Sequence, residues 1–304
     1  MRTREIKENF RDVGMKIAII GAGKMGAWFA KFFQGEGYTV IVSDKNSERL
    51  AKAKREFGVE TADAVSAIKG VDQILICVPI DSFEDVVKEI QSHIEPSQIV
   101  LDICSIKELP VRVMHKYIKT GTVLGMHPIF GPGSKSVNNK NFILTPTNTE
   151  EKRVAEDFKT WLEEKKANVF IMSPRKHDEL MSIVLGFPHF VALVVCDSLV
   201  DQLNFSEARN VAGASYKMLL TLAEAVVLEK AEFYANLQVN LPGLEEIEAL
   251  FLDKAKEWLE IIKRRDRPAL ASKIKDVKIR LLKASPEYAK SYEVMYKMLE
   301  AAES

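Results

Sequence analysis

Residues 15–44 read MKIAIIGAGKMGAWFAKFFQGEGYTVIVSD, and this stretch decides the fold. An apolar run at 16–20 predicts a β-strand that stops at the glycine-rich segment Gly21-Ala-Gly-Lys-Met-Gly26. A helical pattern follows, and a second apolar run at 38–42 leads to Asp44. The order strand, Gly-x-Gly-x-x-Gly, helix, strand, acid predicts the first part of a dinucleotide-binding unit with a parallel sheet.

Each glycine of this segment has a mechanical role. The first allows a tight turn, the second lets the backbone approach a pyrophosphate, and the third lets the helix pack closely on the strand. The helix then directs its free N–H groups and positive dipole end at the phosphates. The alternative is a glycine turn that only packs a helix on a sheet. The residues expected to bind the cofactor are Gly21, Gly23, Met25, Gly26, Asp44 and, after a later strand, Pro79.

Asp44 is expected to select the cofactor. Its carboxylate can accept hydrogen bonds from the two hydroxyls of an adenine ribose, whereas a 2′-phosphate would meet like charge. We therefore predict that NAD is preferred over NADP. Lys45 and Asn46 follow directly and would soften this preference.

The composition is that of an ordinary globular chain. Of 304 residues, 47% are hydrophobic and 28% charged, and 43 basic residues balance 43 acidic ones, so no general electrostatic footprint for nucleic acid is present. Cys77, Cys104 and Cys196 lie far apart in apolar runs, which favours buried thiols in a reducing cytoplasm, and no metal-ligand spacing occurs. Residues 1–14 form a charged extension without the apolar core of a signal peptide.

Residues 181–195 are almost wholly apolar and long enough to suggest a membrane span. Pro188 and His189 lie near the middle of this stretch, and Asp197 follows soon after it. We therefore expect a buried helix of an all-α core and no association with a membrane.

Between residues 15 and 173, apolar runs typical of buried parallel strands alternate with helical patterns. This alternation predicts an α/β domain with a Rossmann-type, doubly wound parallel sheet, which binds ligands at the carboxyl ends of its strands. After residue 44, the expected strands are 72–79, 99–103, 122–126, 142–147 and 169–172, and the expected helices are 47–57, 82–93, 109–117 and 150–165.

The pattern changes at Ser173-Pro174, a helix N-cap followed by a first-turn proline. No convincing strand follows, so residues 174–304 are expected to form an all-helical substrate-binding and dimerisation domain. Its long helices are too apolar for a thin surface layer, which predicts a homodimer whose protomers share one core. The expected helices are 174–202, 206–236, 244–264, 268–283 and 286–302.

His127 is the strongest candidate for a general base. It leaves the expected strand 122–126 at the cofactor edge and enters Pro-Ile-Phe-Gly-Pro-Gly, a loop rich in fixed turns. A histidine there can take a proton from a hydroxyl while hydride leaves the same carbon. The alternative is a loop histidine bonded to backbone. Ser105, after another strand, is expected to orient His127 or the substrate hydroxyl, unless it only caps the helix after Lys107.

His177 and His189 lie twelve residues apart on the expected helix 174–202. At the helical rise this separation is roughly 18 Å, so the two side chains cannot share one metal ion. His177 lies in the first turn, where it would contact the end of the sheet domain. His189 has apolar neighbours and needs a polar partner, which is either a substrate anion or a group within the core.

Together these features resemble the prephenate dehydrogenase family, which includes the arogenate dehydrogenases of tyrosine biosynthesis. The resemblance covers nearly the whole chain after Met15. The motifs that carry it are the glycine segment, Asp102-Ile-Cys-Ser-Ile-Lys107, Gly125-Met-His-Pro-Ile-Phe-Gly-Pro132, Ile143-Leu-Thr-Pro-Thr147, and His177-Asp-x-x-Met followed by Pro188-His189-Phe190.

The resemblance implies an NAD-dependent enzyme that oxidatively decarboxylates prephenate to 4-hydroxyphenylpyruvate. It implies that His127 is the catalytic base, that Ser105 supports it at the substrate hydroxyl, and that His189 contacts the substrate side chain. It also implies that a basic residue, here Lys217, reaches in from the partner subunit. We place His177 with the residues expected to bind this carboxylate substrate.

One position departs from the family's pattern. An arginine nine residues before the tyrosine that matches Tyr234 usually clamps the ring carboxylate, and this chain has Ala225 there. Alanine cannot supply the bidentate fork of a guanidinium. Either Lys217 or Arg209 substitutes, or the substrate is arogenate or another cyclic or β-hydroxy acid. A dinucleotide-binding sensor without catalysis is the third alternative.

Overall fold

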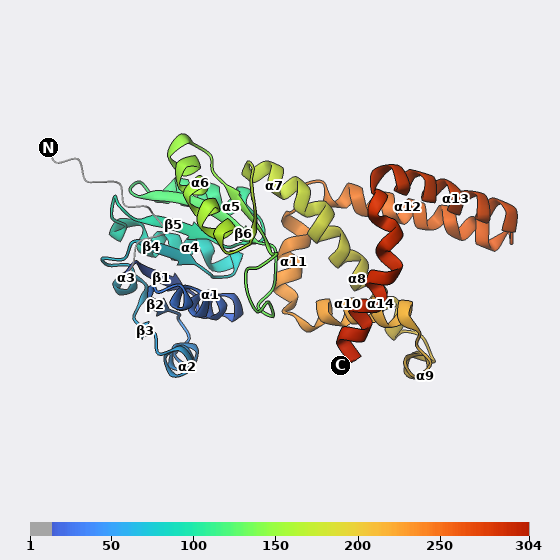
Figure 1. Ribbon diagram of the computed structural model, residues 1–304, viewed down its shortest axis with the longest axis horizontal. Helices are drawn as coiled ribbons and strands as arrows, with labels where there is room; N and C mark the ends of the chain where they lie inside the picture. The colour runs from blue at the N-terminus through green and yellow to red at the C-terminus, as the bar shows by residue number, and fades with distance from the viewer. Residues whose placement is uncertain (1–13, 304) are drawn as a thin grey trace. The chain divides into compact units, whose positions relative to one another are not determined.

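The computed structural model describes residues 14–303. The expected extension at 1–14 therefore lies outside the described residues, apart from Gly14. The chain divides into two compact units, one ending at Leu180 and the other beginning at Met181. The first unit combines a sheet with helices, and the second is helical throughout its described residues (Figure 1). The expected sequence of an α/β domain and an all-α domain is confirmed.

The first unit is built on one eight-stranded sheet with the order β3-β2-β1-β4-β5-β6-β7-β8. β1 lies between β2 and β4, and both pairings are parallel, with Ile19 opposite Val42 and Leu75. This order brings the carboxyl ends of β1, β4, β5 and β6 side by side at one edge, where such sheets bind ligands. The strands are β1 Lys16–Ile20, β2 Thr39–Ser43, β3 Glu60–Thr61, β4 Gln73–Ile76, β5 Ile99–Asp102, β6 Thr122–Pro128, β7 Asn141–Thr145 and β8 Asn168–Ile171.

Helices cover both faces of this sheet. Ile17 and Ile19 of β1 belong to the apolar cluster that contains Phe33, whereas Ala18 belongs to the cluster that contains Val87. Alternate side chains of a strand point to opposite faces, so a strand buried on both sides has a continuous apolar sequence. The helices are α1 Lys24–Gly35, α2 Ser47–Phe57, α3 Ala64–Ala67, α4 Ile80–Ile90, the 3-10 turn η1 Gln91–His93, α5 Glu108–Tyr117, α6 Thr149–Glu164 and α7 Pro174–Met181.

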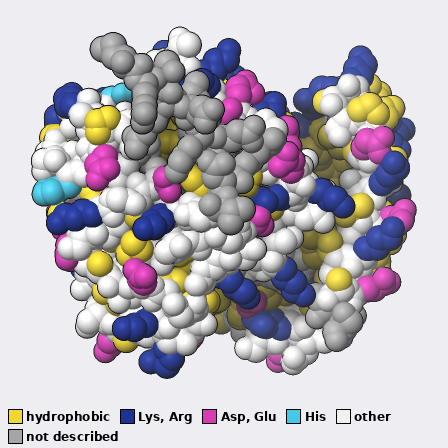
Figure 2. Space-filling view, turned by 60° about the vertical axis from the view of Figure 1, so that its left-hand side comes forward, with side chains coloured by type: hydrophobic (Ala, Val, Ile, Leu, Met, Phe, Trp, Pro, Cys, Tyr) yellow, Lys and Arg dark blue, Asp and Glu magenta, His cyan; other side chains and the backbone are white. Residues whose placement is uncertain are grey.

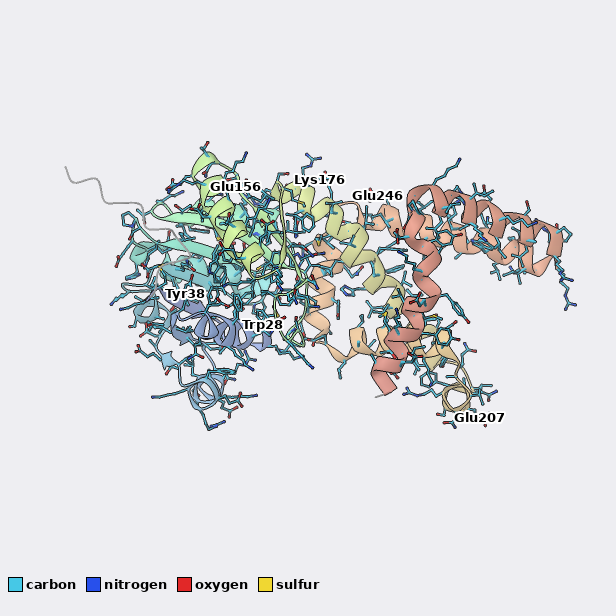
Figure 3. The ribbon with its side chains drawn as sticks, viewed as in Figure 1. Trp28, Tyr38, Glu156, Lys176, Glu207 and Glu246 are labelled. Carbon is cyan, nitrogen blue, oxygen red and sulfur yellow. The ribbon has the colours of Figure 1, made fainter. Side chains whose placement is uncertain are left out.

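Aromatic side chains hold α1 in place. Phe33 of α1 stacks on Trp161 of α6 with 6.0 Å between ring centroids, and Tyr38 packs edge-on against both rings. Trp28, also on α1, packs against Phe130 with 4.9 Å between centroids (Figure 3 labels Trp28 and Tyr38). The helix after the glycine loop is therefore fixed along its length.

Two features of the sheet differ from the expectation. β6 continues beyond residue 126, so His127 and Pro128 belong to the strand, where they pair with Ile143 and Phe142. In addition, β7 runs antiparallel to β6, and β8 pairs parallel with β7. The connection from β6 to β7 contains no helix among its described residues, and an antiparallel partner requires no crossover helix.

The second unit consists of helices joined by short turns. The expected single helix at 206–236 is wrong, because the chain is extended at Gly213 and at Lys230, where new helices begin. The described segments are η2 Ser182–Gly186, α8 Phe187–Val200, α9 Phe205–Asn210, α10 Ala214–Leu228, α11 Ala231–Asn240, α12 Leu244–Lys263, α13 Arg267–Ala284, the 3-10 helix η3 Pro286–Lys290 and α14 Ser291–Glu303.

The segment η2 is a π-helical turn between α7 and α8. The Ser182 hydroxyl donates to the carbonyl of Pro242 at 2.7 Å, and the Gln238 amide donates to the carbonyl of Gly186 at 2.9 Å. A Cβ on Gly186 would lie 2.7 Å from a side-chain carbon of Leu244, so a larger residue there would force the leucine side chains of this packing to move. Neighbouring segments of the same unit thus stabilise a turn that is rarely formed alone.

The expectation of a buried helix at 181–195 is wrong for the single chain. An 18-residue window of the helical stretch 174–200 has a mean hydropathy of 2.1, so the stretch is long and apolar enough to cross a membrane, but only 11% of that window is buried. In α8 itself, Ala192 is the one residue described as buried. α8 packs against α10, which covers only part of its circumference. A large apolar surface of this kind is typical of an interface.

Candidate active site

The glycine-rich loop lies at the carboxyl end of β1. Gly21 has φ +110°, a conformation that strains residues with a side chain, and a Cβ there would lie 2.5 Å from the Cys77 carbonyl oxygen. A Cβ on Gly26 would lie 1.8 Å from the carbonyl oxygen of Gly21, so α1 packs directly on the loop. A Cβ on Gly23 would meet nothing within 4 Å. Open space therefore adjoins the N-terminus of α1.

This N-terminus fits a pyrophosphate. Gly23 is the N-cap residue of α1 and provides no side-chain hydrogen bond to the first N–H groups. The first turn of this described helix contains no acidic residue and begins with Lys24 and Met25. Uncapped N–H groups and the positive end of the helix dipole bind phosphate. The glycine loop thus matches a dinucleotide cofactor in both shape and charge.

Asp44 follows β2 at the same edge of the sheet. Its Oδ2 accepts a hydrogen bond from the backbone N–H of Ala22 at 2.7 Å, and its Oδ1 accepts one from the N–H of Asn46 at 2.8 Å. A guanidinium nitrogen of Arg49 lies 3.6 Å from Oδ2. Pro79 is the N-cap residue of α4, just after β4. The residues expected to bind the cofactor therefore gather around the ends of β1, β2 and β4.

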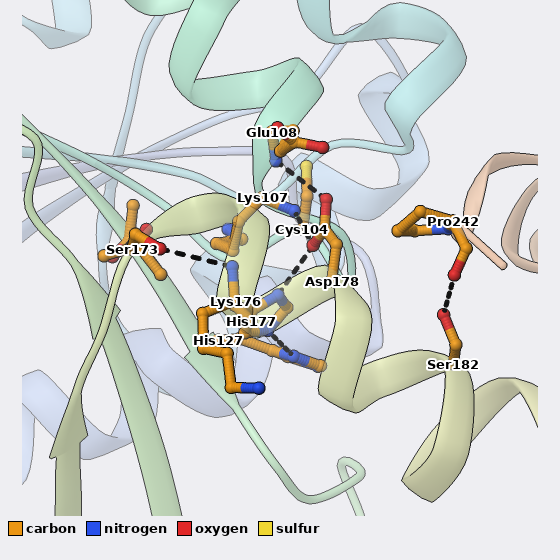
Figure 4. A network of polar contacts seen from close by, with 12 residues as sticks. Cys104, Lys107, Glu108, His127, Ser173, Lys176, His177, Asp178, Ser182 and Pro242 are labelled. Carbon is orange, nitrogen blue, oxygen red and sulfur yellow. Dashed lines mark hydrogen bonds and ion pairs between the residues drawn. The ribbon is translucent and has the colours of Figure 1, made fainter.

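His127 and His177 lie in contact although they are 50 residues apart in the sequence. Nδ1 of His127 is 2.8 Å from Nε2 of His177, and Nδ1 of His177 is 2.7 Å from Oδ1 of Asp178 (Figure 4). His127 is 6% exposed at the end of β6, and His177 is completely buried behind it. We call these three residues the relay. His177 was expected to bind substrate, but its burial places it behind His127 instead.

The direction of the hydrogen bonds in the relay follows from the carboxylate. Because an ionised carboxylate only accepts hydrogen bonds, His177 donates from Nδ1 to Asp178. Nε2 of a neutral His177 is then an acceptor, so His127 donates to it from Nδ1. Nε2 of His127 is left with its lone pair. The relay therefore fixes His127 in the tautomer that a general base at Nε2 requires.

Burial keeps both rings of the relay neutral. Desolvation lowers the pKa of His127 well below its usual value, and positive charge at His177 or Lys107 lowers this pKa further. Desolvation also lowers the pKa of His177, opposed by its hydrogen bond to Asp178. Both imidazoles are therefore uncharged near neutral pH, which is the state in which His127 can accept a proton.

Asp178 also joins α7 to the start of α5. Its carboxylate oxygens accept hydrogen bonds from the backbone N–H groups of Lys107 at 2.7 Å and Glu108 at 2.9 Å. Such N–H groups have no partner within their own helix. Asp178 therefore caps α5, and the alternative that Ser105 caps this helix is wrong. Ser105 lies half-buried in the loop between β5 and α5, and it is not a member of the relay.

A buried ion pair supports the strand that carries His127. Lys107 is completely buried, and its Nζ pairs with the carboxylate of Asp102 and donates to the carbonyl of Met126 at 2.8 Å. Burial raises the pKa of Asp102, although the charge of Lys107 opposes this shift. Since Met126 directly precedes His127, Lys107 ties the end of β6 to the end of β5.

The roles of Asp102, Lys107 and Asp178 were not predicted, although these residues lie within the motifs quoted above. A lysine in a loop is usually exposed, so the sequence carried no signal that Lys107 is buried. Nor was the role of Trp28 predicted, whose indole N–H donates to the carbonyl of Ser134 at 2.6 Å. This bond fastens the loop after His127 to α1. The aromatic residues between 28 and 33 indicate that α1 packs against the sheet, but nothing in the sequence indicates a hydrogen bond from Trp28 to Ser134.

The other expected substrate residues belong to the second unit. His189 lies on α8 with its ring edge-on to Tyr234, 4.7 Å between centroids, and its buried Nδ1 has no partner among the described residues. Burial lowers the pKa of His189. Lys217 is exposed on α10, and so is Ala225. Of the two candidates to replace the missing arginine, Arg209 forms an ion pair with Glu224.

Two family models match this chain. The nucleotide-binding domain of prephenate dehydrogenase matches residues 29–171, and the dimerization domain of prephenate dehydrogenase matches residues 173–276. A probable arogenate/prephenate dehydrogenase from Methanocaldococcus jannaschii is 32% identical over 274 residues, which cover 88% of this chain and 61% of that protein. The chain thus spans about three fifths of the length of the curated relatives.

Solved structures agree with this assignment. The prephenate dehydrogenase from A. aeolicus in complex with hydroxyphenyl propionate and NAD⁺ has a TM-score of 0.73 at 22% identity, covering 89% of this chain and 98% of that chain. The Synechocystis arogenate dehydrogenase has a TM-score of 0.68 at 18% identity, covering 89% and 100%. At these identities the likeness shows the fold. With both family models matched in order along the sequence, the chain belongs to the prephenate dehydrogenase family.

Proposed function

We propose that this protein is an NAD-dependent dehydrogenase that oxidatively decarboxylates prephenate to 4-hydroxyphenylpyruvate. The observation that carries the proposal is the relay, which leaves Nε2 of His127 as a proton acceptor in the unit that holds the glycine loop. Family membership supports this reaction class. The cofactor is proposed to be NAD because Asp44 stands where the adenine ribose is expected.

The proposed chemistry uses few groups. NAD, when bound, would supply the hydride acceptor for the ring carbon that bears the hydroxyl group. Nε2 of His127 accepts the hydroxyl proton, and loss of carbon dioxide makes the ring aromatic. His177 holds the tautomer of His127, and Asp178 holds that of His177. Ser105 and His189 are proposed to contact the substrate.

Arogenate is the second candidate substrate. Ala225 occupies the position at which the resemblance places a carboxylate-binding arginine, and Arg209 is paired with Glu224. Arogenate carries an amino group where prephenate has a keto group. Of the three proteins compared above, the one from Methanocaldococcus jannaschii carries both names, the A. aeolicus enzyme is named prephenate dehydrogenase and the Synechocystis enzyme arogenate dehydrogenase. Reaction with each acid separately decides between them.

The proposed active unit is a homodimer formed by the helical unit. A hollow on this unit is lined by apolar side chains of α8 and α10, among them Phe190, Val194, Val200 and Val227. The match to a dimerization domain favours a second copy of this chain as the occupant. Lys217 is proposed to complete the site of the partner, as the resemblance implies.

On the face shown in Figure 2, basic and acidic side chains are intermixed, so no single-sign surface points to a charged polymer.

The proposal is tested with purified protein, NAD and a panel of acids that contains prephenate and arogenate. We expect NADH to form with one of these two acids. His127→Asn should lower turnover by about 10²–10⁴-fold, because a general base is lost, with NAD affinity unchanged. His93→Asn, an exposed histidine of the same unit, is the matched control. NAD binding without turnover of any acid would instead identify a sensor, and normal turnover of His127→Asn would remove this residue from the mechanism.

A further inference from the structure

Arg49 stands beside Asp44, the acid expected to bind the adenine ribose. It lies in the first turn of α2, and Asn46 fixes that turn by accepting hydrogen bonds from the N–H groups of Glu48 at 2.9 Å and Arg49 at 3.1 Å. From this position a guanidinium nitrogen reaches to 3.6 Å from Oδ2 of Asp44. The basic group is therefore attached to the same short segment as the acid.

The two charges differ in accessibility. The side chain of Asp44 is 6% exposed, and each of its oxygens already accepts a backbone N–H. The side chain of Arg49 is 46% exposed. A ligand that approaches from solvent thus meets the guanidinium together with the carboxylate. The like-charge repulsion expected from Asp44 alone is reduced accordingly.

We infer that Arg49 is a specificity-determining residue that allows this protein to bind NADP as well as NAD. The inference rests on the proposed cofactor site. At 3.6 Å the exposed guanidinium is not closely bonded to Asp44, whose two oxygens already accept backbone N–H groups, so a 2′-phosphate can draw the guanidinium towards itself. Arginine then binds the phosphate through two parallel N–H donors. The ribose of NAD has no such group, so Arg49 contributes little to its binding.

The test is a fluorescence titration of the wild-type protein with NADH and NADPH, repeated with Arg49→Gln. We expect the affinity for NADPH to fall about tenfold, as loss of a charged hydrogen bond predicts, while the affinity for NADH is retained. Arg55→Gln is the matched control, since this exposed arginine lies in the last turn of the same helix. Wild-type affinity for NADPH should also fall more steeply with salt than that of the variant.

Competition by fragments isolates the ribose end. Adenosine 2′,5′-bisphosphate should displace the bound cofactor from the wild type better than AMP does, and Arg49→Gln should remove this difference. Equal losses for NADH and NADPH in Arg49→Gln, or no loss for NADPH, would overturn the inference and leave the dehydrogenase proposal intact. A wild-type protein that binds neither cofactor would overturn both.

Discussion

At the scale of single residues, Asp178 has two tasks. It orients His177, and it caps α5 through the N–H groups of Lys107 and Glu108. The two tasks require different properties of the side chain. Capping needs an oxygen acceptor, which asparagine also has, whereas the relay needs an acceptor that cannot donate. Because Oδ1 accepts from both Nδ1 of His177 and the N–H of Lys107, an amide nitrogen at that position would disturb the relay and one of the two capping bonds together.

We expect Asp178→Asn to lose turnover, and to lose some stability because only one of the two capping N–H groups keeps an oxygen acceptor. An amide that donates to Nδ1 of His177 reverses the relay, so His127 presents an N–H where a lone pair is needed. The loss in kcat should be about 10²-fold or more, with little change in NAD affinity. Glu179→Gln, a neighbouring surface carboxylate, is the control. Full turnover of Asp178→Asn would show that the relay does not set the tautomer.

The lowered pKa values of His127 and His177 also predict an effect of pH on stability. In the folded state both rings resist protonation because they are buried. As pH falls below about 6.5, the unfolded chain therefore binds more protons than the folded chain, and the free energy of unfolding decreases. Above the pKa that the two histidines have in the unfolded chain, both rings are neutral in both states, so the protein keeps its full free energy of unfolding.

Urea unfolding at about pH 7.5 and about pH 5.5 measures this loss. We expect His127→Asn to lose less stability between the two values than the wild type, because one of the two resisting groups is gone. The exposed His93→Asn should behave as the wild type does. An identical loss in all three proteins would mean that His127 is protonated equally in the folded and unfolded states.

At the scale of elements, the ion pair of Lys107 and Asp102 joins β5, β6 and the start of α5. Lys107→Met would leave a buried carboxylate without its counter-charge. We expect the free energy of unfolding to fall by about 3–5 kcal/mol. The double variant Lys107→Met, Asp102→Leu should recover part of this loss, since no charge then stays buried.

Urea denaturation of the single and double variants checks this expectation, with Lys31→Met on the surface of α1 as the control. A single variant as stable as the control would mean that Asp102 is already neutral in the folded protein. Burial raises the pKa of Asp102, so this outcome has a defined physical meaning. The size of the loss thus measures the charge that the pair carries.

Elements with a local signal were predicted well. The order β1, glycine loop, α1, β2 followed from apolar runs and three glycines. A Cβ would clash at Gly21 and Gly26 and would meet open space at Gly23, as the motif requires. The contact of His127 with His177 could not be predicted, because it depends on how α7 packs at the end of β6. The burial of Lys107 and the π turn at Ser182–Gly186 likewise depend on partners that lie far away in the sequence.

At the scale of the whole molecule, the open apolar surface of α8 is the main argument for a dimer. The 18-residue apolar window within residues 174–200 has a mean hydropathy of 2.1, and only 11% of it is buried. Such an exposed apolar surface would be unfavourable in water. A second copy can cover it by a symmetric contact. Sedimentation should therefore give a dimer, and Val194→Glu on this surface should shift it towards monomer.

A mixing experiment tests the proposed exchange of Lys217 between subunits. Lys217→Ala should raise KM for the substrate more than it changes NAD binding, because a point charge near a carboxylate is lost. Mixed dimers of Lys217→Ala and His127→Asn chains should regain one working site. Lys278→Ala, at an exposed lysine of α13, is the control. Mixed with His127→Asn chains, it should give the activity of a mixture in which every site that keeps His127 works without complementation. A protein that sediments as a monomer and stays active when dilute would contradict both the dimer and the shared site.

The π turn Ser182–Gly186 changes the angular position of side chains within one continuous helical stretch. Before this turn, Asp178 faces the start of α5, and at its last residue Gly186 packs against Leu244. In a regular α-helix the directions of these two residues would be fixed relative to each other, since each residue advances the direction by roughly 100°. The wider π turn changes the direction taken by each residue that follows it, His189 among them. Removing a single residue here would leave the sequence on either side unchanged but rotate the side chains that follow by roughly 100° relative to those that precede it.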